Sequence, residues 1–278
     1  MPLKLSIVLS THSAQFQAVA FKGDFEANVA KIANWGYDGV EVAIRDPKLV
    51  NAEELMGAVA AHGLEIPAIG TGQAWGEEGL SYTDPDPAIR TAAIARTVSH
   101  VPLAAQAGAV IIIGLLRGLV KPGVDHAQAM DWLVEALKQC CAEAALYGVR
   151  LALEPICRYE TTLINNLTEG LDLLDRVAAE NMGLMPDSFH MNIEEAVMED
   201  SIRACGDRIF HFHVADSNRW YPGAGHLNFG SILESLFATG YGGYVSGEFM
   251  PFPNADTSAQ KGISHLRSIE GLFADPGA

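Results

Sequence analysis

The chain of 278 residues has the length of one eight-stranded α/β barrel, and its 49% hydrophobic and 19% charged residues are typical of a folded enzyme. This composition excludes a disordered, collagenous or coiled-coil protein. The formal net charge of −16 repels phosphate backbones and anionic lipid head groups, so we expect neither nucleic acid nor membrane partners.

Eight short β-rich runs follow one another along the chain. In chain order they are KLSIVL, DGVEVAI, LEIPAIG, AVIIIG, VRLALE, MGLMPD, IFHFHV and GYVSGE. Segments with helical periodicity lie between them, at residues 24–36, 88–108, 126–148 and 167–183. Glycines at the ends of helical segments indicate left-handed caps at Gly36, Gly63, Gly108 and Gly148. Asp24 and Asp84 occupy positions typical of helix N-caps.

Strict alternation of strand and helix predicts parallel strands joined by right-handed crossovers, in either an open sheet or a closed barrel. The nucleotide-binding patterns GxGxxG and GxxxxGK[ST], which are typical of open sheets, do not occur in the sequence. The count of eight strands and the chain length favour the barrel. Because no linker or change of composition divides the chain, we expect one (β/α)8 TIM-barrel domain over residues 1–278.

The cysteines and the N-terminus indicate a cytoplasmic protein. The four cysteines include no CxxC pair, and adjacent Cys140 and Cys141 are poorly placed for a disulfide or a zinc site. The run LKLSIVLS is short for a signal peptide and is preceded by a single positive charge, so a first barrel strand is the better interpretation. No run is long enough to span a bilayer.

Polar residues close four consecutive predicted strands. Three runs end in Glu154, Asp187 and Glu248, and His213 lies one residue before the end of IFHFHV. Alone, each would be interpreted as a solvated acid or a core histidine, but the ends of barrel strands meet at one rim, where active sites form. Three carboxylates and one imidazole suit Mn²⁺, Mg²⁺ or Co²⁺. The pattern therefore predicts one divalent-metal site.

Four segments, LALEPICRYETTLINN, MPDSFHMNIEE, FHFHVADSNRWYPGAGHLNF and VSGEF, resemble the xylose-isomerase-like TIM barrels of sugar isomerases and epimerases. The greatest similarity is to ketose 3-epimerases such as the D-tagatose and D-psicose enzymes, and its specific part covers residues 149–250. The resemblance implies a metal, usually Mn²⁺, held by the same four residues. It also implies substrate contacts from Glu160, His190 and Arg219, and a homodimer or homotetramer.

The resemblance implies C3 epimerisation of a ketose through a metal-stabilised enediolate. Glu154 and Glu248 would be the catalytic acid and base on opposite faces of C3. His190 and Arg219 would hold the oxygen that gains charge, and Glu160 would shuttle a hydroxyl proton. A plainer interpretation makes Arg219 a surface charge paired with a nearby acid, and Glu160 an acid at a helix start.

Other activities use related sites. An aldose–ketose or hydroxypyruvate-type isomerase and a keto-sugar or keto-inositol dehydratase pass through the same enolate. An apurinic-site endonuclease would need further ligands on early strands and a positive surface, and a barrel that only binds sugars would not need both glutamates. Two loop aromatics, Trp75 and Trp220, are candidates for stacking on a sugar, and Glu41 is a candidate contact for a sugar hydroxyl.

Overall fold

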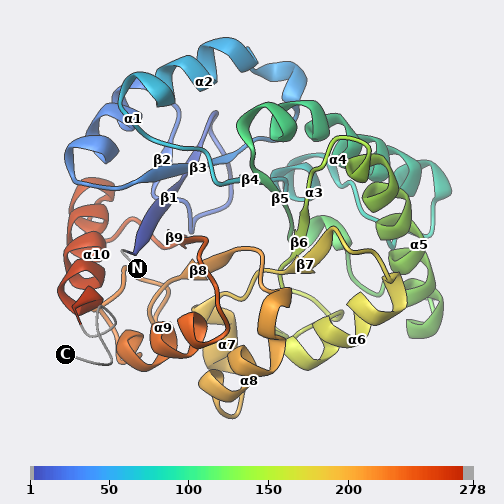
Figure 1. Ribbon diagram of the computed structural model, residues 1–278. Coiled ribbons are helices and arrows are strands. Elements are labelled where there is room, and N and C mark those ends of the chain that lie inside the picture. Colours follow the sequence, from blue (N-terminus) through green and yellow to red (C-terminus); the bar gives the residue numbers. More distant parts are fainter. Residues whose placement is uncertain (1–2, 272–278) are drawn as a thin grey trace.

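A closed ring of parallel strands surrounded by helices forms the protein (Figure 1). The computed structural model describes residues 3–271. Strands follow one another in the order β7-β6-β5-β4-β3-β1-β9-β8. Parallel bridges from Leu184 to Ile209 and from Asp187 to His213 then join β7 to the β8 segment. The predicted (β/α)8 barrel is therefore confirmed.

Each of the eight predicted β-rich runs contains a strand of the barrel. The strands are β1 Lys4–Ser10, β3 Gly39–Ala43, β4 Ala68–Gly70, β5 Val110–Ile113, β6 Leu151–Leu153, β7 Met182–Leu184, β8 Phe212–Val214 and β9 Tyr244–Gly247. A two-residue strand, β2 Phe21–Lys22, was not predicted. It pairs with Leu9 and Ser10 at the end of β1, beyond the four β1 residues that pair with β9.

Helices cover the outer face of the barrel. They are α1 Phe25–Asn34, α2 Ala52–Ala61, α3 Gln73–Glu78, α4 Pro87–Ala107, α5 His126–Ala145, α6 Leu167–Val177, α7 Ser188–Glu194, α8 Met198–Cys205, α9 Phe229–Ala238 and α10 Ala255–Glu270. Short 3₁₀ turns occur at Pro47–Leu49, Leu115–Arg117 and Gly206–Arg208. The four predicted helical segments correspond to α1, α4, α5 and α6, although α6 ends at Val177 rather than at residue 183.

The predicted caps are confirmed for the glycines and only in part for the aspartates. All four glycines have positive φ, the conformation that glycine adopts most readily: Gly36, Gly63, Gly108 and Gly148. Asp24 precedes α1, but its side chain makes no capping hydrogen bond within residues 3–271. The prediction for Asp84 is wrong, because α4 starts at Pro87 and the carboxylate of Asp86 caps it. Asp84 instead accepts a hydrogen bond from the backbone N–H of Asp86.

The interior of the barrel has an apolar half and a polar half. The apolar half is a cluster of five buried side chains: Ala68, Val110, Ile112, Ala152 and Met185. Glu41, His211 and His213 lie in the polar half and are each about 1% exposed. Strand periodicity explains this arrangement, because Val40 and Val42 pack into the core outside the sheet while Glu41 points inward. The polar half leads up to the candidate site.

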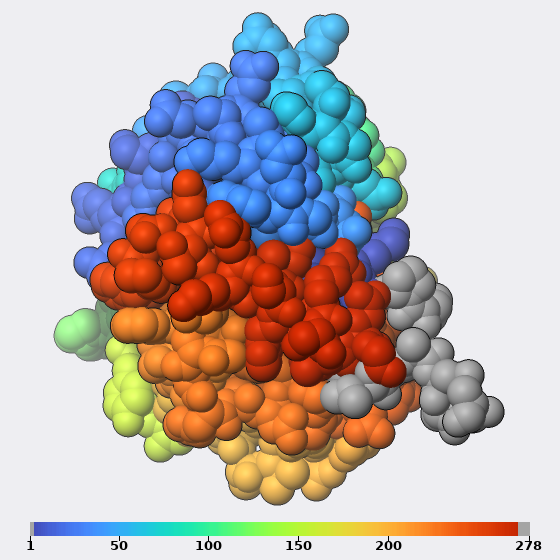
Figure 2. All heavy atoms as spheres, turned by 90° about the vertical axis from the view of Figure 1, so that its left-hand side faces the viewer, coloured from blue at the N-terminus to red at the C-terminus, as the bar shows by residue number. Residues whose placement is uncertain are grey.

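Helix α10 packs against the segment between α1 and β3. Figure 2 shows α10, in red, between the blue N-terminal helices and the orange α9. The hydroxyl of Tyr37 donates a hydrogen bond of 2.9 Å to the carbonyl of Ala259, and Arg267 forms an ion pair of 2.7 Å with Asp38. All four cysteines are buried and free. Within residues 3–271, no helix has the length and apolarity needed to cross a membrane.

Candidate active site

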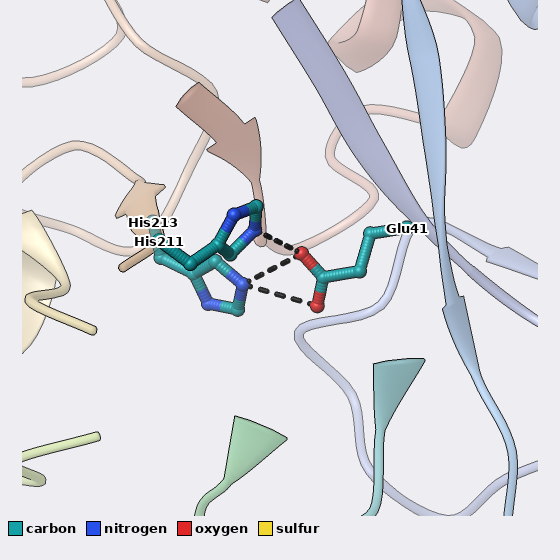
Figure 3. A group of neighbouring side chains, drawn as sticks. All are labelled: Glu41, His211 and His213. Atoms are coloured by element: carbon teal, nitrogen blue, oxygen red, sulfur yellow. Dashed lines mark hydrogen bonds and ion pairs between the residues drawn. The ribbon is translucent and has the colours of Figure 1, made fainter. Parts of the chain in front are cut away.

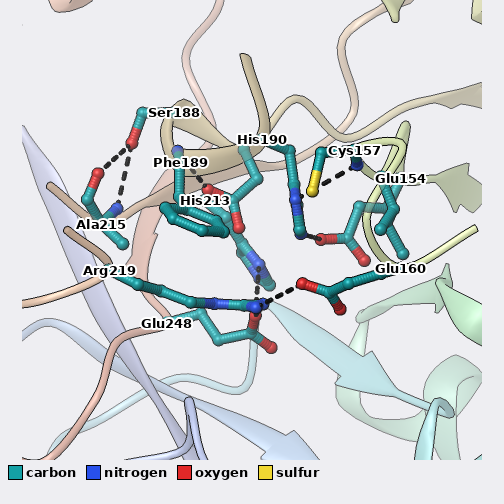
Figure 4. Close-up of polar contacts among 12 residues, drawn as sticks. Glu154, Cys157, Glu160, Ser188, Phe189, His190, His213, Ala215, Arg219 and Glu248 are labelled. Carbon is teal, nitrogen blue, oxygen red and sulfur yellow. Dashed lines mark hydrogen bonds and ion pairs between the residues drawn. The ribbon is translucent and has the colours of Figure 1, made fainter. Parts of the chain in front are cut away.

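The four residues predicted at strand ends converge at one end of the barrel. Glu154 and Glu248 directly follow β6 and β9, Asp187 lies just after β7, and His213 lies within β8. One possible ligand atom from each of these residues lies within 4.8 Å of the others. Figure 4 shows Glu154, His213 and Glu248 directed toward a common centre.

Two of these side chains present a buried polar atom without a partner. Asp187 caps α7, since its Oδ1 accepts a hydrogen bond of 2.8 Å from the backbone N–H of Phe189, while its Oδ2 has no partner in the described chain. The Nδ1 atom of His213 is also buried and has no hydrogen-bond partner among the described residues. It lies 4.0 Å from Oε2 of Glu248. Buried polar groups normally find partners, so both atoms fit a bound cation. The oxygen-rich donor set suits Mn²⁺, Mg²⁺ or Co²⁺.

The position of Glu154 depends on a glycine and on a histidine. A side chain at Gly114 would place its Cβ 2.9 Å from Oε2 of Glu154 and would displace the carboxylate from this position. The backbone N–H of Cys157 donates to Nδ1 of His190 at 3.3 Å. Neutral His190 therefore carries its proton on Nε2, which lies 3.7 Å from Glu154. Burial and the charge of Arg219 lower the pKa of His190, which keeps this ring neutral.

Without a cation, the cluster of acids is unfavourable when fully ionised. Burial raises the pKa of Glu154 well above its usual range, and the charge of Glu248 adds to this effect. Burial also raises the pKa of Asp187, and it raises the pKa of Glu248 to about 7. Burial alone would lower the pKa of His213, but the charges of Glu41 and Glu248 raise it to about 10. A cation that binds here therefore displaces protons, so its affinity increases with pH.

Glu248→Gln should make the cation-free protein more stable at pH 8. A carboxyl group whose pKa is higher in the folded state than in the unfolded state stabilises the fold at pH values below its unfolded-state pKa. This contribution is lost as the pH rises toward the folded-state pKa. For Glu248 this window extends from its ordinary pKa of 4.5 to about 7. The gain in unfolding free energy is at most about 3 kcal/mol. Thermal unfolding with a chelator at pH 5 and pH 8 measures it, and a variant less stable than wild type at pH 8 would contradict it.

Arg219 lies above the four residues and links two acids. Its guanidinium lies 2.6 Å from Oε1 of Glu160 and 3.6 Å from Oε2 of Glu248. The centroid of the Phe189 ring lies 4.7 Å from the guanidinium carbon. The plainer interpretation of Arg219 and Glu160 is therefore wrong. Asp216, the nearby acid considered as a partner for Arg219, instead accepts backbone N–H groups of its own loop.

A cavity of about 340 Å³ opens onto this cluster. Its lining includes Glu154, His213 and Glu248 together with the three predicted substrate contacts, Glu160, His190 and Arg219. An apolar wall faces these polar groups and consists of Val8, Phe16, Val19, Trp75, Ile112, Leu115 and Ile156. Trp220 instead stacks against Phe252, with ring centroids 5.5 Å apart.

Sequence reasoning missed two features of this cavity. Phe16 lies in the loop after β1 and Gln73 begins the short helix α3, and the sequence pattern defines the position of neither side chain in the cavity. Glu41 was expected to contact a sugar, whereas its carboxylate accepts hydrogen bonds from His211 and His213 (Figure 3). The spacing of His211 and His213 was the available signal, because alternate residues of an extended segment share one face.

Comparison with known proteins identifies the family. The family model described as xylose isomerase-like TIM barrel matches residues 29–269. An L-ribulose 3-epimerase of Methylomonas sp. is 31% identical, over 83% of this chain and 82% of the relative. A D-psicose 3-epimerase of Ruminiclostridium cellulolyticum is 30% identical, over 90% of this chain and 85% of the relative.

A solved D-allulose 3-epimerase of Methylomonas sp. in complex with D-allulose superposes with a TM-score of 0.81 at 26% identity, covering 96% of this chain and 97% of that one. These relatives are epimerases, which are enzymes of the isomerase class, and they support an enzyme of that class here. The extent of the family match, the barrel and the strand-end cluster agree, and the chain belongs to the xylose isomerase-like TIM barrel family.

Proposed function

We propose that the protein is a divalent-metal-dependent ketose 3-epimerase. The observation that carries the proposal is the pair of carboxylates, buried Glu154 and partly buried Glu248, which reach the same cavity from β6 and β9. Two other strands, β7 and β8, separate the strands that carry them. Inversion at one carbon requires an acid and a base on opposite faces, and this pair provides both. The activities of the curated relatives support the same reaction.

The two glutamates exchange roles between the two directions of the reaction. One carboxylate removes the C3 proton of the ketose, and the carboxylic acid on the other face returns a proton to the same carbon. When bound, a divalent cation stabilises the negative charge that develops on the ketose oxygens.

Three further side chains bind and orient the substrate. His190 offers its Nε2 proton beside Glu154, and Arg219 offers guanidinium N–H groups beside Glu248. Both are donors for a substrate oxygen that gains charge. Glu160 holds the guanidinium from the other side and accepts a hydroxyl proton of the sugar. The pKa of Arg219 stays above its usual value because the charges of Glu248 and Glu160 outweigh its burial.

The lining of the cavity favours an unphosphorylated sugar. Arg219 is the only lysine or arginine among the described residues that line it, and its charge is already paired with Glu160 and Glu248. Glu41, Glu77, Glu154, Glu160 and Glu248 are acids of the same lining. A phosphate dianion would meet a repulsive field here, whereas neutral hydroxyls find many acceptors. The apolar wall with Phe16 and Trp75 suits the carbon face of a sugar.

Mn²⁺ is the cation we propose, held by Glu154, Asp187, His213 and Glu248. Three carboxylates and one imidazole are hard or borderline ligands, which manganese accepts in preference to a thiolate site. The thiol near this cavity, that of Cys157, is buried, and burial raises its pKa. A neutral thiol competes poorly with carboxylates for the cation.

The proposal is tested by incubating Mn²⁺-loaded protein with a panel of free ketoses and their 1-phosphates and identifying the products by chromatography. The expected result is a C3 epimer from at least one free ketose and much slower conversion of the phosphorylated sugars. A Glu154→Gln/Glu248→Gln double variant is the control for a contaminating activity. Conversion to an aldose or loss of water would contradict the proposal, because these reactions belong to an isomerase or a dehydratase.

A further inference from the structure

The buried carboxylate of Glu41 has no part in the proton transfers described above, yet it lies directly behind a proposed cation ligand. Its Oε2 atom lies 2.8 Å from Nε2 of His211 and 2.9 Å from Nε2 of His213, and its Oε1 lies 3.1 Å from the latter. Figure 3 shows both imidazole rings directed at this one carboxylate. All three residues are about 1% exposed.

The chemistry of Glu41 determines which nitrogen of His213 remains available. The Oε2 atom of Glu41 lies within hydrogen-bond distance of both Nε2 atoms, and a carboxylate oxygen placed between two imidazole nitrogens accepts a hydrogen bond from each. Both Nε2 atoms must then donate, which leaves Nδ1 of His213 directed away from Glu41 and toward Glu248, 4.0 Å away. A cation that binds there replaces the Nδ1 proton, while Glu41 keeps the Nε2 proton in place.

We infer that Glu41 is the positioning residue of the cation site: it fixes the ring orientation and the protonated nitrogen of His213 so that Nδ1 faces Glu154, Asp187 and Glu248. A carboxylate behind a ligating histidine has this effect in metal sites generally, where its loss weakens metal binding by about 10- to 100-fold. This inference rests on the proposed cation site.

His211 holds Glu41 in its turn. A buried carboxylate is stable only when it is paired and hydrogen bonded, and His211 supplies a second N–H to the same oxygen. A chain of two hydrogen bonds thus runs from His211 through Glu41 to His213 and leaves that histidine one orientation.

The test compares Glu41→Gln with a matched variant, Ser246→Ala. Ser246 is buried, is paired in register with His213, and its hydroxyl has no partner within the described residues, so its loss removes no hydrogen bond. The dissociation constant of Mn²⁺, measured by electron paramagnetic resonance, should rise about 10-fold or more for Glu41→Gln. For Ser246→Ala it should stay within about 2-fold of wild type.

A spectroscopic signature separates positioning from a general loss of stability. In protein saturated with diamagnetic Mg²⁺, nuclear magnetic resonance should show the Nε2 proton of His213 far downfield, as expected for a bond to a carboxylate. In Glu41→Gln this signal should move upfield, because the acceptor is no longer charged. Glu41→Leu removes the acceptor entirely. If Glu41→Leu does not fold, the comparison of Glu41→Gln with wild type still decides the question.

The outcomes distinguish this inference from the proposed function. A folded Glu41→Gln protein that binds Mn²⁺ like wild type, with an unchanged His213 signal, would overturn the positioning role. Wild-type protein that binds no Mn²⁺ would overturn both the cation site and this inference. Normal Mn²⁺ binding without any sugar conversion, together with weak binding by Glu41→Gln, would support the inference and refute only the epimerase.

Discussion

Replacing Glu154 or Glu248 by glutamine should lower turnover by about 10²-fold or more while most cation binding remains. Glutamine preserves the size of the side chain and one coordinating oxygen but cannot accept or return the C3 proton, and a positioned acid or base accounts for a rate effect of this size. Initial rates in both directions, with Mn²⁺ content measured on the same samples, give the result. Glu234→Gln, an exposed change on α9, is the control.

Each single variant also has a directional signature. The variant that retains the proton-abstracting glutamate for one epimer should exchange the C3 hydrogen of that epimer with solvent without converting it. An isomerase that moves a proton on one face has no need for both carboxylates. Near wild-type interconversion by either variant would therefore contradict the two-base mechanism.

His213→Ala should weaken Mn²⁺ binding by at least about 10-fold, the scale on which even supporting residues act. The substitution removes the only nitrogen ligand of the proposed site and leaves the buried carboxylate of Glu41 with one partner fewer. Titration of chelator-treated protein with Mn²⁺ measures the change, and wild type should bind about one ion per chain. His12→Ala is the matched control, since His12 is exposed and its ring contacts Thr11.

Unchanged Mn²⁺ content in a folded His213→Ala protein would remove this residue from the site. Because the variant also disturbs Glu41, its thermal unfolding must be measured alongside. A loss of stability with unchanged Mn²⁺ affinity would still contradict the prediction.

The barrel strands and the strand-end cluster could be predicted from the sequence because both follow from local patterns. A buried parallel strand needs only a short apolar run, and all eight runs are strands. Glu154, Asp187, His213 and Glu248 each close such a run, and closure of the barrel brings those ends together.

The remaining features depend on contacts between distant parts of the chain. The bond between Glu41 and His213 joins residues 172 positions apart, and it requires both the register of β3 and the closure of the ring. Arg219 donates its hydrogen bond to Glu160, 59 positions earlier, rather than to an acid of its own loop. Asp84 and Asp86 both precede Pro87, so the sequence does not show that Asp86 rather than Asp84 is the cap of α4. Local patterns do not distinguish such choices.

The most direct test of the central claim is the position of deuterium in sugars recovered from D₂O. Mn²⁺-loaded protein is incubated with D-fructose, D-psicose, D-tagatose and L-ribulose, and the products are analysed by nuclear magnetic resonance. C3 epimerisation by two bases predicts deuterium at C3 of the newly formed epimer and none at C1. Deuterium at C1 together with an aldose product would contradict the account.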